Sequence, residues 1–138
     1  MGCRVKGRAL SGGSATGTAL VLDEPLSLWG GLDPATGRII DARHPQRGST
    51  VTGRILVMAG VRGSSSSSSV LAESARAGTA PAAILLGEPD LILAVGAAVA
   101  EELYGVRVPL VLLSPGEVLA IPDGAAVTIA EDGAVSVG

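Results

Sequence analysis

The sequence predicts an α/β domain in which a parallel sheet, covered by helices, packs against a second layer of strands. Two observations lead to this β/β/α architecture. Residues 50–113 alternate short aliphatic runs with helical segments, an order typical of parallel strands joined by helical crossovers. The flanking segments are rich in turns and short strands, and the length of 138 residues fits one domain spanning residues 1–138.

The first third of the chain is expected to contain short strands and turns. Alternating or aliphatic runs at residues 4–10, 18–22 and 38–41 predict strands. Between the last two runs, residues 33–37 (DPATG) have the composition of a turn, with Asp first, Pro second and Gly last. Trp29, followed by two glycines, is expected either in core packing or in an interface.

The central stretch gives the clearest secondary-structure signals. Buried strands are expected at residues 50–58, 82–86 and 109–113, because these runs are short and aliphatic. Helices are expected at residues 70–77 and 90–104, where Gly78 and Gly105 supply the stops. The tail adds two further short strands, at residues 126–130 and 134–137.

Composition excludes several classes of function. The net charge of −3 and the near absence of aromatic residues give no basic or base-stacking surface for nucleic acid. No apolar run reaches the length of a membrane span, so a membrane protein is not expected either. Cys3 is the only cysteine and His44 the only histidine, which excludes an intrachain disulfide, makes a metal site within this chain improbable and favours a cytoplasmic setting.

Six consecutive serines, residues 64–69, are the most unusual feature of the sequence. Such a run often forms a flexible linker. Here it stands between an expected strand and an expected helix, and a helix that begins with serines offers hydroxyls and amides to an anion. A simple helix cap is a further interpretation. Arg62, two residues before Ser64, is a candidate for binding an anionic substrate.

A serine hydroxyl needs an activating partner, because it is not ionised near neutral pH. A triad of Ser64 with His44 and either Asp33 or Asp41 is conceivable, although the chain has no G-x-S-x-G motif. A loop-stabilising role for His44 is the simpler interpretation.

The order of motifs resembles the aconitase X swivel domain. Residues 24–37 (EPLSLWGGLDPATG) are similar to that family's signature, and further similarities follow at His44-Pro45, residues 53–57, Arg62-Gly63-Ser64-Ser65, residues 78–84 and residues 94–97. Val61 departs from the glycine common in relatives. The resemblance implies a swivelling β/β/α fold like the small subunits of aconitase and isopropylmalate isomerase.

The resemblance also implies an activity and a partner. In such enzymes a larger subunit, or a fused larger domain, holds an iron–sulfur cluster, and the small piece closes over the site and supplies a serine general base for dehydration. By the family motif that serine is Ser64, with Arg62, Gly63 and Ser65 as substrate-binding neighbours. The substrate would be a small hydroxy acid, with cis-3-hydroxy-L-proline favoured over mevalonate 5-phosphate. A non-catalytic interaction module remains an alternative of another class.

Overall fold

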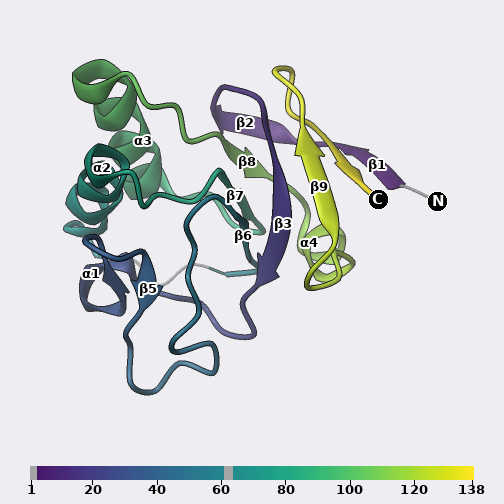
Figure 1. Cartoon of the computed structure of the whole chain (residues 1–138). Helices are drawn as coiled ribbons and strands as arrows, with labels where there is room; N and C mark the ends of the chain where they lie inside the picture. Colours follow the sequence, from purple (N-terminus) through teal and green to yellow (C-terminus); the bar gives the residue numbers. More distant parts are fainter. Residues whose placement is uncertain (1–2, 61–63) are drawn as a thin grey trace.

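The structure is a computed structural model that describes residues 3–60 and 64–138. Figure 1 shows strands curled around one centre with three helices stacked to one side. The strands are β1 (Cys3–Lys6), β2 (Arg8–Ser11), β3 (Ala15–Val21), β4 (Leu32–Asp33), β5 (Arg38–Ile39), β6 (Ile55–Met58), β7 (Ala83–Leu86), β8 (Leu110–Leu112), β9 (Ala126–Ile129) and β10 (Ala134–Val137). The helices are α1 (Leu28–Gly31), α2 (Ser67–Ala77), α3 (Leu91–Tyr104) and α4 (Pro115–Leu119).

The main sheet is curled, and its two edge strands follow one another directly in the chain. Its strand order is β1-β10-β9-β3-β6-β7-β8-β2, and β1 and β2 are separated only by Gly7. A Cβ at Gly7 would lie 2.2 Å from Val111 Cγ1, so only glycine fits where the chain passes from one end of the sheet to the other. β3 likewise pairs with β9 through its first half and with β6 through its second half. The result is two packed β layers.

The helical layer covers the parallel part of this sheet. β3, β6, β7 and β8 are parallel neighbours, and α2 and α3 connect β6 to β7 and β7 to β8. α2 lies between α1 and α3 (Figure 1), and it contacts both. The expected β/β/α arrangement is therefore confirmed.

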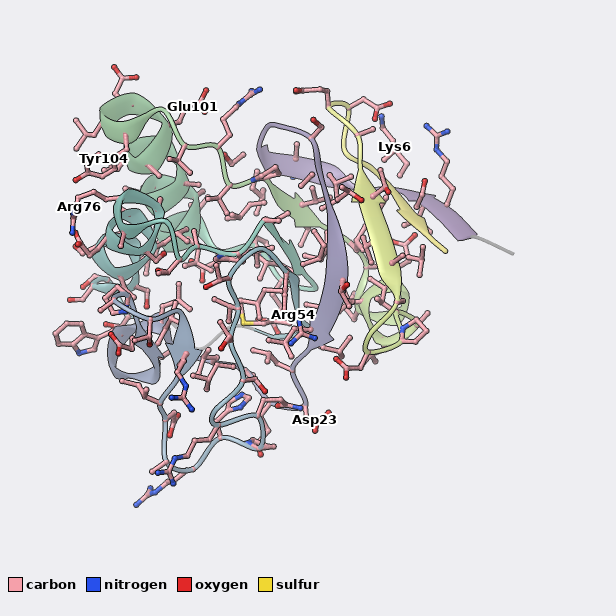
Figure 2. All side chains as sticks on the ribbon, viewed as in Figure 1. Lys6, Asp23, Arg54, Arg76, Glu101 and Tyr104 are labelled. Atoms are coloured by element: carbon pink, nitrogen blue, oxygen red, sulfur yellow. The ribbon has the colours of Figure 1, made fainter. Side chains whose placement is uncertain are left out.

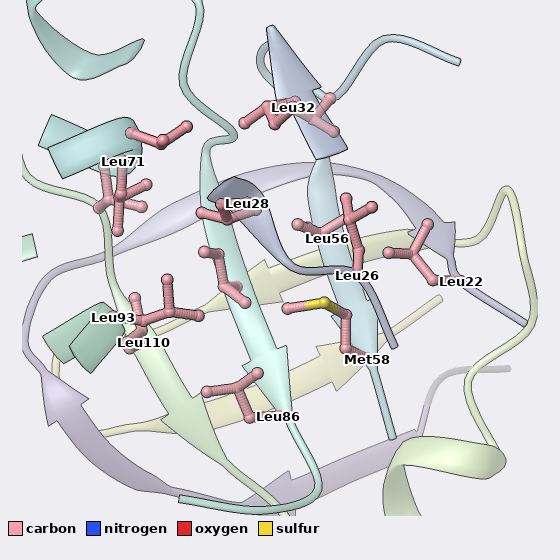
Figure 3. Packing of buried hydrophobic residues seen from close by; sticks show 14 of the residues in the cluster. Leu22, Leu26, Leu28, Leu32, Leu56, Met58, Leu71, Leu86, Leu93 and Leu110 are labelled. Carbon is pink, nitrogen blue, oxygen red and sulfur yellow. The ribbon is translucent and has the colours of Figure 1, made fainter. Parts of the chain in front are cut away.

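Two hydrophobic cores lie on opposite sides of the central strands. Leu56 and Ile84 belong to the core under the helices, and their neighbours Val57 and Leu85 belong to the core between the two β layers. Because successive side chains of a strand point to opposite faces, each central strand serves both cores. Figure 3 shows the first core, where leucines from the loop before α1 and from α1 itself pack over β6 and β7.

Several element boundaries differ from the sequence-based expectation. The strand expected at residues 4–10 is two strands, β1 and β2, and β3 begins at Ala15 rather than at residue 18. α2 begins at Ser67 rather than at residue 70, so the last three serines are helical. β6 begins only at Ile55, because a turn in which Arg54 N–H bonds to Val51 carbonyl, with Gly53 at φ 69°, precedes it. α4 (Pro115–Leu119) is a short helix in a segment for which no helix was expected.

α4 has a sequence signal of its own. Ser114 accepts a bond from the Glu117 N–H, and the Glu117 carboxylate accepts one from the Ser114 N–H. This reciprocal capping box, with Pro115 as the first helical residue, marks a helix start.

Candidate functional site

The carboxyl ends of four neighbouring strands meet at one edge of the sheet. β3, β6, β7 and β8 run parallel, so the segments that follow them lie together at this edge. A Cβ at Gly60 would lie 3.4 Å from Pro25 Cγ and 3.6 Å from Glu88 Oε1, which places the segments after β3, β6 and β7 side by side. Asp23, just past the arrowhead of β3, marks this edge in Figure 2. Ligands of α/β sheets characteristically bind there.

The serine run forms a turn at this edge and then the first turn of α2. Ser64 is half-buried, and its Oγ accepts a long hydrogen bond of 3.4 Å from the Ser66 N–H. Its carbonyl accepts a bond of 2.9 Å from the Ser67 N–H. Ser68 Oγ donates to the Ser65 carbonyl at 3.0 Å. The run is therefore ordered local structure between a strand and a helix, and the linker interpretation is wrong for the described serines.

The electrostatics of this turn favour a negative charge. The first turn of α2 contains no acidic side chain, and the Ser66 side chain makes no capping bond. No acidic side chain of that turn therefore compensates the positive end of the dipole of this eleven-residue helix, which lies beside Ser64. This arrangement can hold the carboxylate of a ligand or stabilise an oxyanion on Ser64 Oγ.

Ser67 connects the serine turn to the segment that contains Trp29. Its side chain is only 3% exposed, and its Oγ accepts a bond of 3.3 Å from the Trp29 N–H. Sequence reasoning missed this residue, because the six serines are identical in type and only the onset of the helix identifies the buried one. Ser67 thus fixes α1 against the N-terminus of α2.

The predicted site residues are described in part. Ser64 and Ser65 lie in the turn before α2, and their expected roles in catalysis and substrate binding stay predictions. Arg62 and Gly63 lie outside the described residues, so their expected role in substrate binding stays a prediction.

His44 has a structural environment instead of a catalytic one. It is 5% exposed, its Nδ1 accepts a bond from the Gln46 N–H at 3.1 Å, and its Nε2 lies 2.9 Å from the Glu24 carbonyl. Because Nδ1 accepts a hydrogen bond, the ring proton is on Nε2, and the Nε2–H group donates a hydrogen bond to the Glu24 carbonyl. Both ring nitrogens are engaged with backbone, so His44 is not free to activate Ser64.

The acids considered for a triad also serve their own loops. Asp33 accepts from the Ala35 N–H and the Thr36 hydroxyl, and Asp41 accepts from the Arg43 N–H. These are local Asx-type contacts that stabilise turns.

The described residues contain no group of three or more His, Cys, Asp or Glu side chains suited to a metal ion. Within the same residues, no helix combines the length and the hydropathy needed to cross a membrane.

Large apolar side chains are exposed around the serine turn. Trp29 is 61% exposed, and Leu91 and Val95 of α3 are 73% and 56% exposed. The exposure of Trp29 favours the interface interpretation over core packing. The signal missed in α3 is that residues 91–100 contain no polar residue on any face, whereas a helix on a protein surface normally has a polar stripe.

Comparison with known proteins relates this geometry to a family. A family model described as the aconitase X swivel domain matches residues 4–137. The cis-3-hydroxy-L-proline dehydratase of Pseudomonas aeruginosa is 52% identical over 106 residues, which are 77% of this chain but 18% of that protein. The chain thus spans under a fifth of that relative.

A second relative is closer in length. The phosphomevalonate dehydratase small subunit of Methanothermobacter thermautotrophicus is 44% identical over 93 residues, which cover 67% of this chain and 71% of that subunit. The crystal structure of aconitase X from Thermococcus kodakaraensis superposes with a TM-score of 0.87 at 35% identity, covering 99% of this chain and 98% of that one. With the model match and this fold together, the chain belongs to the aconitase X swivel domain family.

Proposed function

We propose that this chain is the small subunit of an aconitase X-type dehydratase, a carbon–oxygen hydro-lyase, and that Ser64 is its general base. The observation that carries the proposal is the position of Ser64, at the carboxyl edge of the parallel strands and before the N-terminus of α2, whose first turn has no acidic side chain. Residues 1–138 then form a single swivel domain.

The proposed step is a proton abstraction coupled to loss of hydroxide. Ser64 Oγ, as an alkoxide, takes a proton from the carbon next to the substrate carboxylate, and a carbon–carbon double bond forms as hydroxide leaves the adjacent carbon. The proton remains on Ser64 Oγ. The helix dipole favours the alkoxide, and Arg62, Gly63 and Ser65 are assigned to the anionic group of the substrate.

We place the iron–sulfur cluster in the large subunit. The described residues of this chain do not fit such a group: they offer no cluster of suitable side chains, and both ring nitrogens of His44 are engaged. The family membership and the name of the Methanothermobacter relative, a small subunit, support a larger partner. We place the complex in the cytoplasm, in keeping with the single cysteine of this chain.

The proposed substrate is cis-3-hydroxy-L-proline. The higher identity to the Pseudomonas dehydratase, 52% against 44% for the Methanothermobacter subunit, supports it. Mevalonate 5-phosphate is the second candidate, supported by the subunit name of that archaeal relative. Both substrates carry a carboxylate that suits the N-terminus of α2.

The test is turnover of the enzyme reconstituted with its large subunit, measured on both substrates. Ser64→Ala is expected to lower kcat by about 10²–10⁴-fold, the range for loss of a general base. Ser69→Ala, an exposed serine of the same run, is the matched control and should keep normal turnover. Near-normal dehydration by Ser64→Ala would exclude Ser64 as the base and leave a non-catalytic module.

A hydrolase centred on Ser64 and His44 predicts a different result. The chain alone would then cleave an ester or phosphate, and His44→Ala would abolish that activity. The hydrogen bonds of His44 to Gln46 and Glu24 argue against this outcome.

A further inference from the structure

Three segments of the helical layer beside the serine turn carry no charged side chain. Residues 26–32, 64–72 and 91–100 contain no Asp, Glu, Lys or Arg, although such residues make up 17% of the chain. The three segments contribute α1, the first half of α2 and most of α3, which are neighbours in the helical layer. Depletion of charge is the compositional mark of the centre of a protein interface.

Two contacts place exposed apolar side chains on both sides of α2. On one side, the Trp29 N–H bonds to Ser67 Oγ, and the indole next to it is 61% exposed. On the other side, Gly96 packs so closely on α2 that a Cβ would lie 2.8 Å from the Ser68 carbonyl oxygen. Val95, beside that glycine, and Leu91, one turn earlier, are both exposed.

Leu91 also lies at the same edge of the sheet as Ser64. α3 follows β7 and the serine turn follows β6, and these strands are parallel neighbours. Asp90 caps α3 by accepting bonds from the Ile92 and Leu93 N–H groups at 2.9 and 3.0 Å, which fixes the start of the helix. The Leu91 side chain is thus held on an ordered helix end, 73% exposed, beside the proposed active-site edge.

We propose that Trp29, Leu91 and Val95 form the docking surface for the large subunit, on the helical layer next to Ser64. This inference rests on the proposed function, which supplies the partner. The Pseudomonas relative supports this occupant: the segment similar to this chain is 18% of a single polypeptide, so in that protein it is covalently joined to a much larger remainder. Trp is among the residue types enriched at interface hot spots, where a large side chain is fully desolvated by the partner.

The first arm of the test measures binding of the separately purified large subunit of aconitase X type from the same genome by titration calorimetry. Trp29→Ala is expected to raise Kd about 10–100-fold, and Leu91→Ser about tenfold. Leu119→Ser is the matched control. Leu119 is 74% exposed on α4, which packs on the other core, and its substitution should leave Kd within about twofold. All three side chains are exposed, so thermal melts should stay close to that of the parent chain.

The second arm separates this inference from the proposed function. Ser64→Ala should bind the large subunit with unchanged Kd while turnover is lost. If Ser64→Ala keeps turnover while Trp29→Ala weakens binding, the docking surface stands and the proposed function fails. If Trp29→Ala and Leu91→Ser bind like the parent chain, the docking surface is overturned. Light scattering that shows a dimer of this chain broken by Leu91→Ser, with large-subunit binding unaffected, would also overturn it.

Discussion

The central strands have a buried hydrophobic core on each side, but the layers that cover these two cores present different outer surfaces. On the side of the β layer, the strands present polar side chains outward: Thr128 is exposed between buried Val127 and Ile129, and Lys6 pairs with Asp132 at 3.1 Å. On the helical side, residues 26–32, 64–72 and 91–100 are uncharged and expose Trp29, Leu91 and Val95. A hydrophobic strand pattern therefore identifies a core. Whether the outer surface of the covering layer faces water or another protein is indicated only by the exposed side chains of that surface.

The largest effect is expected from the two cores themselves. Ile84 and Leu85 are adjacent in β7, both are fully buried, and they point into different cores. Ile84→Ala and Leu85→Ala should each lower the free energy of unfolding by about 2–5 kcal/mol, through lost burial and a cavity. Calorimetry should show one transition for each variant, because β6, β7 and β8 are common to both cores.

A difference between the two sides would appear as a second transition. If the helical side of Ile84→Ala melted separately while the β layer stayed folded, the two cores would unfold as independent units. The two sides of the sheet would then differ in stability as well as in surface. Ser136→Ala, an exposed position in β10, is the control and should change the free energy by at most about 0.5 kcal/mol.

A smaller change in the free energy of unfolding is expected at two helical glycines, one in α3 on the helical side of the sheet and one in α4 on the other side. Gly96 of α3 faces the backbone of Ser68, where a Cβ would lie 2.8 Å from the carbonyl oxygen. Gly116 of α4 has nothing within 4 Å of that position. Gly96→Ala should therefore cost about 1–3 kcal/mol through overpacking, in spite of the better helix propensity of Ala.

Gly116→Ala is the matched change and should be neutral or stabilise the fold by up to about 1 kcal/mol. Chemical denaturation of both variants measures the difference. Equal stabilisation by the two substitutions would mean that the contact between α2 and α3 at Gly96 is loose.

Local signals were sufficient to predict most of the fold. The parallel strands and α3 follow from aliphatic runs and from glycine stops: Gly78 and Gly105 end α2 and α3 with φ values of 78° and 67°. These are short-range effects, because a left-handed residue ends a helix whatever surrounds it. The β/β/α order then follows from chain topology.

Long-range contacts explain what the sequence did not predict. The pairing of β1 with β10 joins the two ends of the chain, and no local pattern contains that partnership. Ser67 is buried because α1 covers it, a fact that six identical serines cannot reveal. His44 was open to a catalytic interpretation until its contacts with Gln46 and Glu24 were known.

The smallest effect concerns the polar surface of the β layer. A bond from the Ala134 N–H, and then the ammonium of Lys6, lower the pKa of Asp132 below its ordinary value of 3.8. A depressed folded-state pKa means that the stabilisation is present above the unfolded value and is lost as the pH falls through the folded one. Asp132→Asn should therefore lower Tm slightly at pH 7, and the difference from the parent chain should shrink below about pH 4. Melting both proteins across this range cancels the titration of the other carboxylates. A difference that stayed constant or grew in acid would show that the charge of Asp132 does not stabilise this end of the β layer.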